Sequence, residues 1–264
     1  LLGLQKDKVV MSPFVRNKLA SKLDEGKIAI IANGLNNPEI CDFLGQLDFD
    51  ACFIDMEHGN IDWKDIPNIT RACELWGMST VLRVNRIEES LILRALDLGA
   101  GSIMVPHVRT ANDAIKASKA CRYPPQGTRG VAGNRRSYGV NDYYNKANSD
   151  VRLIGLIEDK EAIDNLDEIL EVEGLDILYV APSDLAASLG FIGQNDHPEV
   201  KKIIFNTLKK IILKGKTAGT LANDENLNEY IEMGVKCIGI PWQLWVVKSA
   251  NNLKDKINKF YMNN

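Results

Sequence analysis

Two acidic residues stand where apolar runs of the sequence end. One run, Val151–Ile157, leads directly into Glu158, and a second, Ile177–Val180, is soon followed by Asp184. These runs, with helical spacing between them, predict a parallel β-α-β unit whose strands lie about 4.8 Å apart. Carboxylates at the ends of such strands would repel one another. The arrangement therefore favours a divalent cation between them, and oxygen ligands suit Mg²⁺ or Mn²⁺.

The residues alone leave two other roles open for this pair. Glu158 and Asp184 are equally suited to structural salt bridges, or to work as a general acid and a general base. Neither has a histidine or cysteine next to it in the sequence, which argues against zinc.

Charged residues also end the second and third predicted strands. Asp55 and His58, in DMEHG, are predicted to be an acid/base pair, because a carboxylate can fix the tautomer of an imidazole and stabilise its protonated form. The alternative is that Asp55 caps the next helix and His58 is a solvated loop residue. Arg83, in LRVNR, is predicted to bind an anionic substrate group, with a structural ion pair to Glu57 as the alternative.

Weaker candidates are His107, which follows a strand end, and the pair Arg135 and Arg136. His107 is expected either to line the pocket or to lie behind its wall. The arginine pair is expected either to reach an acidic substrate or to form a solvated part of a loop.

Apolar segments alternate with segments of helical spacing along the whole chain. Eight such pairs predict a single (β/α)₈ barrel, whose active site lies at the carboxyl ends of the strands. A doubly wound open sheet is the rival, but no G-x-G-x-x-G follows the first strand. The predicted strands are Ile28–Ala32, Ala51–Asp55, Ser79–Val84, Ser102–Pro106, Val151–Glu158, Ile177–Val180, Thr217–Leu221 and Cys237–Ile240. The predicted helices are Pro38–Gln46, Ile66–Trp76, Glu88–Leu98, Ala111–Cys121, Ala162–Leu170, Pro198–Lys214, Glu225–Met233 and Leu244–Tyr261.

The barrel domain is expected to take up residues 1–264, with an N-terminal extension over 1–13 and one long loop over about 122–150. Long loops in compact domains are usually functional. This loop should start at the amino-terminal end of the barrel, yet it is long enough to cross to the other end.

Composition narrows the class of partner. The chain is 45% hydrophobic and 25% charged, with a formal net charge of −3, which gives no electrostatic case for nucleic acid or membrane. Its five cysteines are scattered without C-x-x-C spacing, so free thiols in a reducing compartment are expected rather than disulfides or structural zinc. The first residues lack a signal-peptide pattern. A cytoplasmic protein acting on small molecules is expected.

Several motifs, taken in order, resemble a known family. They are DMEHG, LRVNR, ALDLGAGSIMVPHV, RYPPQGTRGV, LIED, DNLDEILEVEGLDILYVAPSDLAASLG and DHPEV. They closely resemble the class II pyruvate aldolases of the HpcH/HpaI aldolase/citrate lyase family, which includes 4-hydroxy-2-oxoheptanedioate and 2-keto-3-deoxy sugar acid aldolases. The resemblance implies a (β/α)₈ barrel that forms trimers or hexamers and exchanges C-terminal helices between subunits.

The resemblance also implies an activity. The enzyme would reversibly cleave a 4-hydroxy-2-keto acid to pyruvate and an aldehyde through an enolate stabilised by Mg²⁺, Mn²⁺ or Co²⁺. Glu158 and Asp184 match the metal-binding carboxylates, Arg83 matches the arginine that holds the keto acid, and His58 matches the base. The remaining matches are Asp55 as the orienting partner of His58, backbone amides around Ser183 for the pyruvate carboxylate, Leu221 on the aldehyde side and Asp97 near a subunit boundary.

The chain departs from the family pattern at several places: the usual GPADL is APSDL, the loop GNRRSYGV is shorter than usual, and two more changes alter the pocket wall. Leu156 stands where members usually have Gln, and the final strand ends Ile240-Pro241-Trp242 instead of V-D-T. These changes leave open a condensing enzyme that forms a citrate-like product, or an acyl-CoA ester lyase. A non-catalytic barrel scaffold is disfavoured, because a scaffold needs none of the charged residues at the strand ends.

Overall fold

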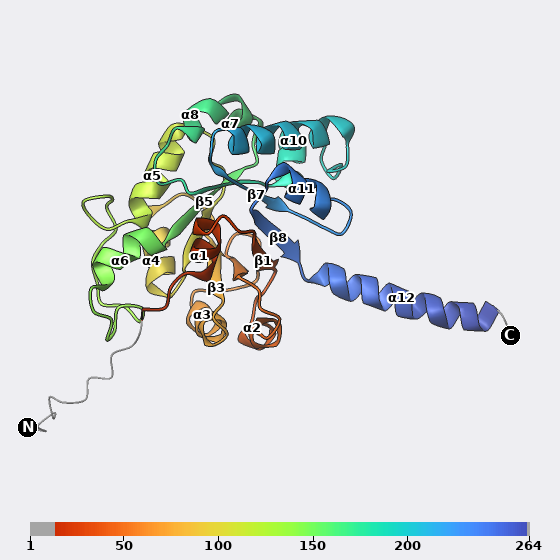
Figure 1. Cartoon of the computed structure of the whole chain (residues 1–264), viewed down its shortest axis with the longest axis horizontal. Coiled ribbons are helices and arrows are strands. Elements are labelled where there is room, and N and C mark those ends of the chain that lie inside the picture. The colour runs from red at the N-terminus through yellow and green to blue at the C-terminus, as the bar shows by residue number, and fades with distance from the viewer. Residues whose placement is uncertain (1–13, 263–264) are drawn as a thin grey trace, which may run out of the picture.

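The computed structural model describes residues 14–262 and shows a closed barrel of eight parallel strands in sequence order, surrounded by helices (Figure 1). The expected (β/α)₈ barrel is therefore confirmed. The strands are β1 (Ala29–Asn33), β2 (Ala51–Asp55), β3 (Ser79–Arg83), β4 (Ser102–Val105), β5 (Arg152–Ile157), β6 (Ile177–Val180), β7 (Thr217–Leu221) and β8 (Cys237–Pro241). The N-terminal extension predicted over residues 1–13 lies outside the described residues.

The helices follow the predicted order with additions. They are α1 (Lys18–Asp24), α2 (Pro38–Gly45), α3 (Ile66–Leu75), α4 (Glu89–Asp97), α5 (Ala111–Cys121), α6 (Tyr143–Asp150), α7 (Lys160–Asp164), α8 (Leu166–Leu170), α9 (Pro182–Ser188), α10 (Pro198–Leu213), α11 (Leu227–Met233) and α12 (Gln243–Met262). The helix predicted over Ala162–Leu170 is in fact two short helices, which meet at Asn165. Helices α1, α6 and α9 were not predicted.

Apart from β1, where Ile30 is exposed, the strands are buried on both sides, which explains their continuous apolar sequences. Alternate residues point into the barrel, where Phe53, Met104 and Tyr179 belong to an inner core. Their neighbours point outward and pack under the helices, as Cys52 does in β2. Side chains therefore fill the barrel interior, and its carboxyl-terminal mouth is left to carry chemistry.

The amino-terminal end of the barrel is closed by α1 and the long loop. Leu19 of α1 is fully buried in the inner core. The buried Asn17 side chain accepts the Ala20 amide and donates to Gly101 O and Ser102 Oγ, both at 2.9 Å. This network ties the start of the described chain to the base of β4.

The long loop stays at this same end, which answers the question that the sequence left open. Its arginines pair with acids at the amino-terminal side of the barrel, so Arg135 and Arg136 do not reach the mouth. The pairs are Arg122–Asp176 (2.9 Å), Arg129–Asp97 (2.9 Å), Arg135–Glu74 (2.5 Å) and Arg136–Asp150 (3.3 Å). The loop thus seals and stabilises the barrel.

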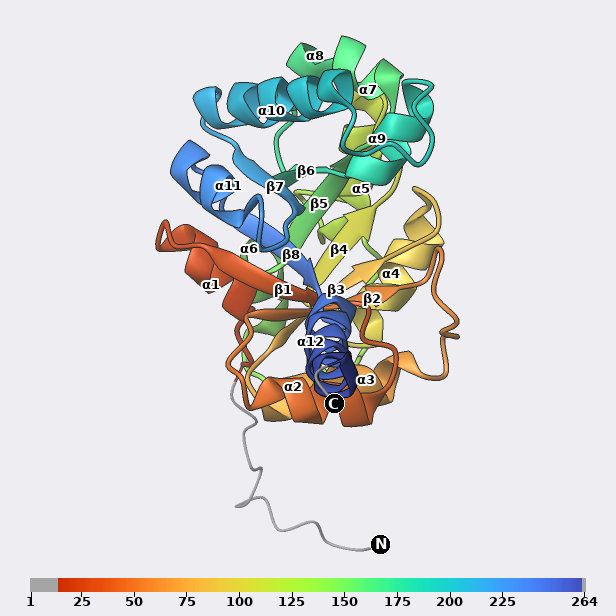
Figure 2. The same ribbon diagram turned by 90° about the vertical axis from the view of Figure 1, so that its right-hand side faces the viewer.

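The last helix leaves the barrel. Trp242 donates from Nε1 to Gly34 O (3.1 Å), and Trp245 stacks on Phe49, which anchors the base of α12 beside β1. Beyond this base α12 projects away from the barrel (Figures 1 and 2), and it has no buried residue. Among the described residues no helix is long and apolar enough to span a membrane.

Candidate active site at the mouth of the barrel

A cavity of about 180 Å³ opens at the carboxyl ends of the strands. Five of the residues singled out in the sequence line it: His58, Arg83, Ser183, Asp184 and Leu221. They come from β2, β3, β6 and β7 or the loops after them, so the barrel brings together positions far apart in the chain. The floor is formed by inward-facing strand residues, Phe53, Met104, Leu156 and Tyr179.

Arg83 is held by two carboxylates at this mouth. The parallel register places it directly beside Asp55, and the two form a bidentate pair with N–O distances of 2.9 and 2.6 Å. Its Nη1 atom lies 3.2 Å from Glu57 Oε2. Burial opposes the charge on Arg83, but the bonds to Asp55 and the charges of Glu57 and Glu158 raise its pKa above the ordinary value. The guanidinium is therefore a fixed positive charge in the wall.

Asp55 differs from its expected role. Its carboxylate meets Arg83, and its contact with His58 is through the backbone, because Oδ1 accepts the amides of Glu57 (3.0 Å) and His58 (3.3 Å). Burial works against ionisation, yet Arg83 and these amides lower the pKa of Asp55. Among the described residues no side chain bonds the His58 ring, which is exposed at the cavity. Asp55 thus shapes the loop that presents His58, without orienting its imidazole directly.

Glu158 is an acid buried without a lysine or arginine partner in the described chain. Its side chain is 2% exposed, and Oε1 accepts the backbone amide of His107 at 2.7 Å. Burial raises the pKa of Glu158 to about 6; the charges of Asp184 and Glu57 add to the rise, and His107 opposes it. Asp184 lines the cavity at the same mouth of the barrel.

His107 supports Glu158 from behind. The residue adopts a left-handed backbone with φ 53°, a conformation that costs a side-chain-bearing residue about 1–3 kcal/mol. Nδ1 lies 2.9 Å from Asp159 Oδ2 and 3.4 Å from Glu158 Oε1, and Arg109 also pairs with Asp159. These contacts hold the strained turn and fix one oxygen of Glu158, and His107 itself is not among the residues that line the cavity.

Asp184 and Ser183 lie in the first turn of α9. The Asp184 carboxylate has neither a hydrogen bond nor an ion pair within the described residues, while Ser183 Oγ accepts from Asn195 Nδ2 at 2.9 Å. Leu221, the last residue of β7, forms an apolar part of the cavity wall. Asp97 lies elsewhere: it ends α4 and bonds Arg129 at the amino-terminal end, on the opposite side of the barrel.

The sequence analysis did not predict three residues of the site as functional candidates. Asn33 ends β1 and lines the cavity, but the first strand was predicted to stop one residue earlier. Tyr179 looked like an ordinary strand residue. The buried Asn33 Oδ1 and Tyr179 hydroxyl have no protein partner in the described chain. Glu57 was considered only as an ion-pair partner of Arg83. Its position in DMEHG, at the end of the second strand with Asp55 and His58, could have identified it as a site residue.

The donor set fits a hard divalent cation. Four carboxylates, those of Asp55, Glu57, Glu158 and Asp184, are grouped with one guanidinium. Glu158 is buried with a raised pKa, and Asp184 has no partner among the described residues. Protein cations therefore do not balance the charge of these two acids. Carboxylate oxygens are the ligands that Mg²⁺ and Mn²⁺ prefer.

Comparison with known proteins gives the class. The model of the HpcH/HpaI aldolase/citrate lyase family matches residues 33–240. The chain is 34% identical over 249 residues to a 5-keto-4-deoxy-D-glucarate aldolase of Citrobacter koseri, covering 92% of this chain and 97% of that protein. It is 38% identical over 190 residues to a hydroxypyruvate/pyruvate aldolase of Roseobacter denitrificans, covering 70% and 74%.

A solved structure agrees with these relatives. A family protein from Burkholderia cenocepacia superposes with a TM-score of 0.85 at 30% identity, covering 92% of this chain and 99% of that one. The chain belongs to the HpcH/HpaI aldolase/citrate lyase family. The expectation of an aldolase-type enzyme is confirmed at this level.

The Asp55–Arg83 pair gives a test of how the mouth is held. We expect Asp55→Asn to lower the free energy of unfolding by up to about 3 kcal/mol, the low end of the range for breaking a buried ion pair, because the Asp55 side chain keeps 20% exposure. Asparagine still accepts the loop amides, so the change isolates the lost charge. Urea denaturation measures the effect.

The control is Asp196→Asn, which breaks the exposed pair with Lys201 and should change the unfolding free energy by less than about 1 kcal/mol. Equal effects of the two substitutions would show that Arg83 does not depend on Asp55.

Proposed function

We propose that the chain is a metal-dependent aldolase that reversibly cleaves a 4-hydroxy-2-keto acid to pyruvate and an aldehyde. The observation that carries the proposal is the set of four carboxylates at the barrel mouth, two of them paired with Arg83, with an accessible His58 in the same cavity. The names of the relatives, a keto-deoxy sugar acid aldolase and a pyruvate aldolase, support this substrate class.

Glu158 and Asp184 are the residues that we propose to hold a divalent cation, Mg²⁺, Mn²⁺ or Co²⁺. When bound, such a cation supplies Lewis-acid stabilisation of the negative charge that develops on a keto oxygen. His107 would keep one oxygen of Glu158 fixed, which leaves the other oxygen for coordination.

The protein groups supply the remaining parts of the reaction. Arg83, fixed by Asp55 and Glu57, places a positive charge where an enolate oxygen would lie. His58 would accept the proton of the substrate 4-hydroxyl, directly or through a water, as the carbon–carbon bond breaks. Backbone amides at Ser183 and Asp184 would receive the pyruvate carboxylate, since they lie in the first turn of α9.

The aldehyde side of the site is proposed to lie against Leu221. Asn33 and Tyr179 offer polar atoms that a bound substrate would satisfy. Asp97 lies at the far end of this chain's barrel, so a part for it in catalysis requires contact with another subunit.

A condensing enzyme is the second candidate. The observation that favours it is Leu156, which gives the cavity an apolar wall where family members usually have a glutamine. An acyl-CoA ester lyase fits less well, because a cavity of about 180 Å³ suits a small metabolite. The cytoplasmic location remains a prediction.

Product analysis tests the reaction. The protein is incubated with Mg²⁺, pyruvate and a panel of aldehydes and semialdehydes, and the products are identified by mass. We expect 4-hydroxy-2-keto acids, loss of turnover in EDTA and recovery with Mg²⁺, Mn²⁺ or Co²⁺. A citrate-like product from oxaloacetate and an acyl donor would favour the condensing enzyme instead. Turnover that resists chelation, or a pyruvate adduct trapped by borohydride, would exclude the metal mechanism.

The base assignment has its own test. We expect His58→Asn to lower kcat by about 10²–10⁴-fold, the usual contribution of general-base catalysis, with metal affinity unchanged. His197→Asn is the matched control, because His197 caps α10 and stacks on Phe191 outside the cavity lining. Near-normal turnover of the His58 variant would remove the base role.

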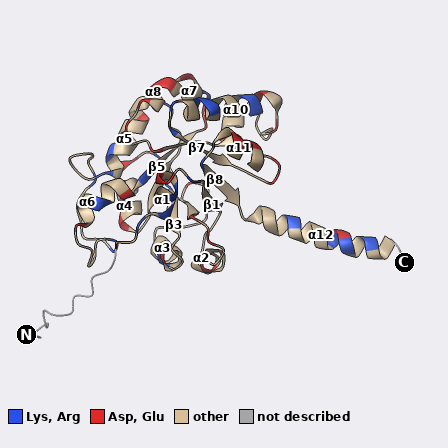
Figure 3. Cartoon of the chain, in the orientation of Figure 1, with Lys and Arg blue, Asp and Glu red and all other residues tan. Residues whose placement is uncertain are grey.

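We also propose that the protein is a homo-oligomer in which α12 lies on a neighbouring subunit. A helix that projects alone with exposed apolar residues, among them Val247, Leu253 and Ile257, is unfavourable in water. An apolar groove of about 630 Å³ runs between the base of α12 and α2, lined by Phe43 and Leu47. Figure 3 shows that charged residues, mostly lysines, gather on the far half of the helix.

The assembly is tested at two neighbouring positions of α12. We expect the double change Leu253→Glu and Ile257→Glu to reduce the molar mass measured by light scattering, because it puts charge into the apolar face. The control is Asn251→Glu with Asn258→Glu, which adds the same charge at polar positions and should keep the assembly intact. A monomeric parent protein, or a double variant of unchanged mass, contradicts the proposal.

A further inference from the structure

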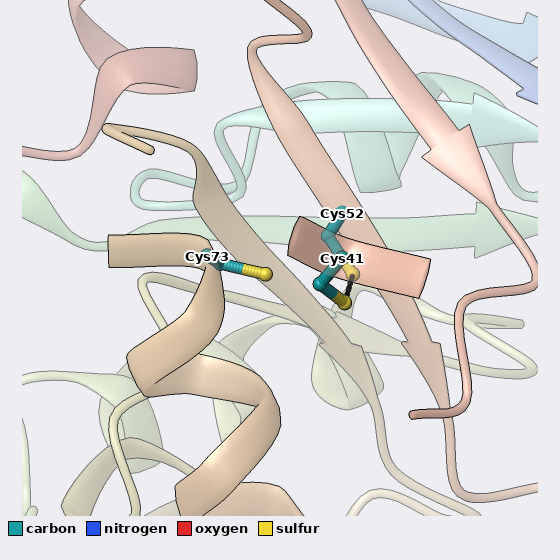
Figure 4. A group of neighbouring side chains, drawn as sticks. All are labelled: Cys41, Cys52 and Cys73. Atoms are coloured by element: carbon teal, nitrogen blue, oxygen red, sulfur yellow. Dashed lines mark hydrogen bonds between the residues drawn. The ribbon is translucent and has the colours of Figure 1, made fainter. Parts of the chain in front are cut away.

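Three cysteines gather beneath the helical layer of the barrel. Cys41 comes from α2, Cys52 from β2 and Cys73 from α3, and all three side chains are fully buried (Figure 4). Cys52 points outward from β2, whereas its neighbour Phe53 points into the barrel. The barrel wall therefore separates this cluster from the cavity at the mouth.

The three sulfur atoms converge. All lie within 4.8 Å of one another, and Cys41 Sγ is 3.8 Å from Cys52 Sγ. Three sulfurs around one cation at a metal–sulfur distance of about 2.3 Å would be separated by about 4.0 Å. The observed spacing is thus close to that of a planar three-sulfur site, without rearrangement of the helices.

The donor set selects the kind of cation. Within the described chain this group contains sulfur ligands alone, with no histidine or carboxylate among them. Hard cations such as Mg²⁺ prefer oxygen, and structural zinc sites almost always have four ligands. Soft thiolate ligands select Cu(I). A site with three sulfurs and no fourth ligand therefore suits this monovalent soft cation better than zinc.

The charge of the cluster agrees with a monovalent ion. All three thiols are fully buried in an apolar layer, where each additional negative charge is costly. One thiolate is therefore easier to form than three, and one thiolate with one monovalent cation is neutral in an apolar interior. Each thiol that becomes a thiolate releases its proton to solvent.

We propose that Cys41, Cys52 and Cys73 form a binding site for a single soft, thiophilic cation of the Cu(I) type. The site ties α2 and α3 to β2 and is separate from the carboxylate group at the mouth. It does not depend on the aldolase activity.

The test measures copper on the intact protein. The full chain, reduced and kept anaerobic, is titrated with Cu(I) in competition with a chromophoric Cu(I) chelator, with incubation long enough for a buried site to load. We expect one Cu(I) per chain, an ultraviolet sulfur-to-copper charge-transfer band, and three sulfur neighbours by X-ray absorption. Failure to retain Cu(I) against the chelator, or a first shell of nitrogen or oxygen, overturns the proposal.

Matched substitutions assign the ligands. We expect Cys73→Ala to weaken Cu(I) binding at least about 100-fold, since even the loss of a ligand's hydrogen-bond partner costs about 10–100-fold. Cys121→Ala is the control, because Cys121 is a buried cysteine at the end of a helix in the same outer core. The Cu(I) affinity of the Cys121→Ala variant should equal that of the parent protein.

Equal Cu(I) affinity in the two variants overturns the assignment. Circular dichroism confirms that each variant is folded, and Cys73→Ser replaces Cys73→Ala if the alanine variant is not. The sulfur count on the parent protein decides the case independently of either variant.

Discussion

The excess of carboxylate at the mouth of the barrel is the constraint on which the site depends. Within the described part of the chain Glu158 is buried without an ion pair to a lysine or arginine, and Asp184 adds a second charge at the same mouth. Burying an unpaired acid is costly, so the fold tolerates it only where something else supplies positive charge. Arg83 cannot do so alone, because Asp55 and Glu57 already occupy it.

The two ends of the barrel have different roles, one structural and one in ligand binding. At the amino-terminal end the acids Asp97, Glu74 and Asp150 pair with arginines of the long loop. Asp50 pairs there with Lys18 and Lys22, and Asn17 bonds the base of β4. At the carboxyl-terminal end the Asn33 Oδ1 atom and the Tyr179 hydroxyl have no protein partner among the described residues. Both residues line the cavity, so these groups are available to a ligand, in agreement with the general location of active sites in such barrels.

The strained backbone of His107 helps to build the carboxyl-terminal end of the barrel. Its left-handed conformation is unfavourable in isolation, and its bonds to Glu158 and Asp159 compensate for that cost. The same local structure fixes one oxygen of the buried acid, because the His107 amide donates to Glu158 Oε1.

The sequence by itself determined the barrel, most strand boundaries and the grouping of His58, Arg83 and Asp184, because buried parallel strands are continuous apolar runs and their carboxyl ends share one edge. It also placed Glu158 after β5 and Asp184 after β6, at the carboxyl ends of neighbouring strands. It did not determine that Asp55 bonds Arg83 and not the His58 ring, that Asp97 faces the other end, or that the arginine loop closes the base. Those outcomes depend on strand register and on the path of a loop, which arise from contacts between residues far apart in the chain. Side-chain pairing across strands is set by register, and no local pattern of residues records it.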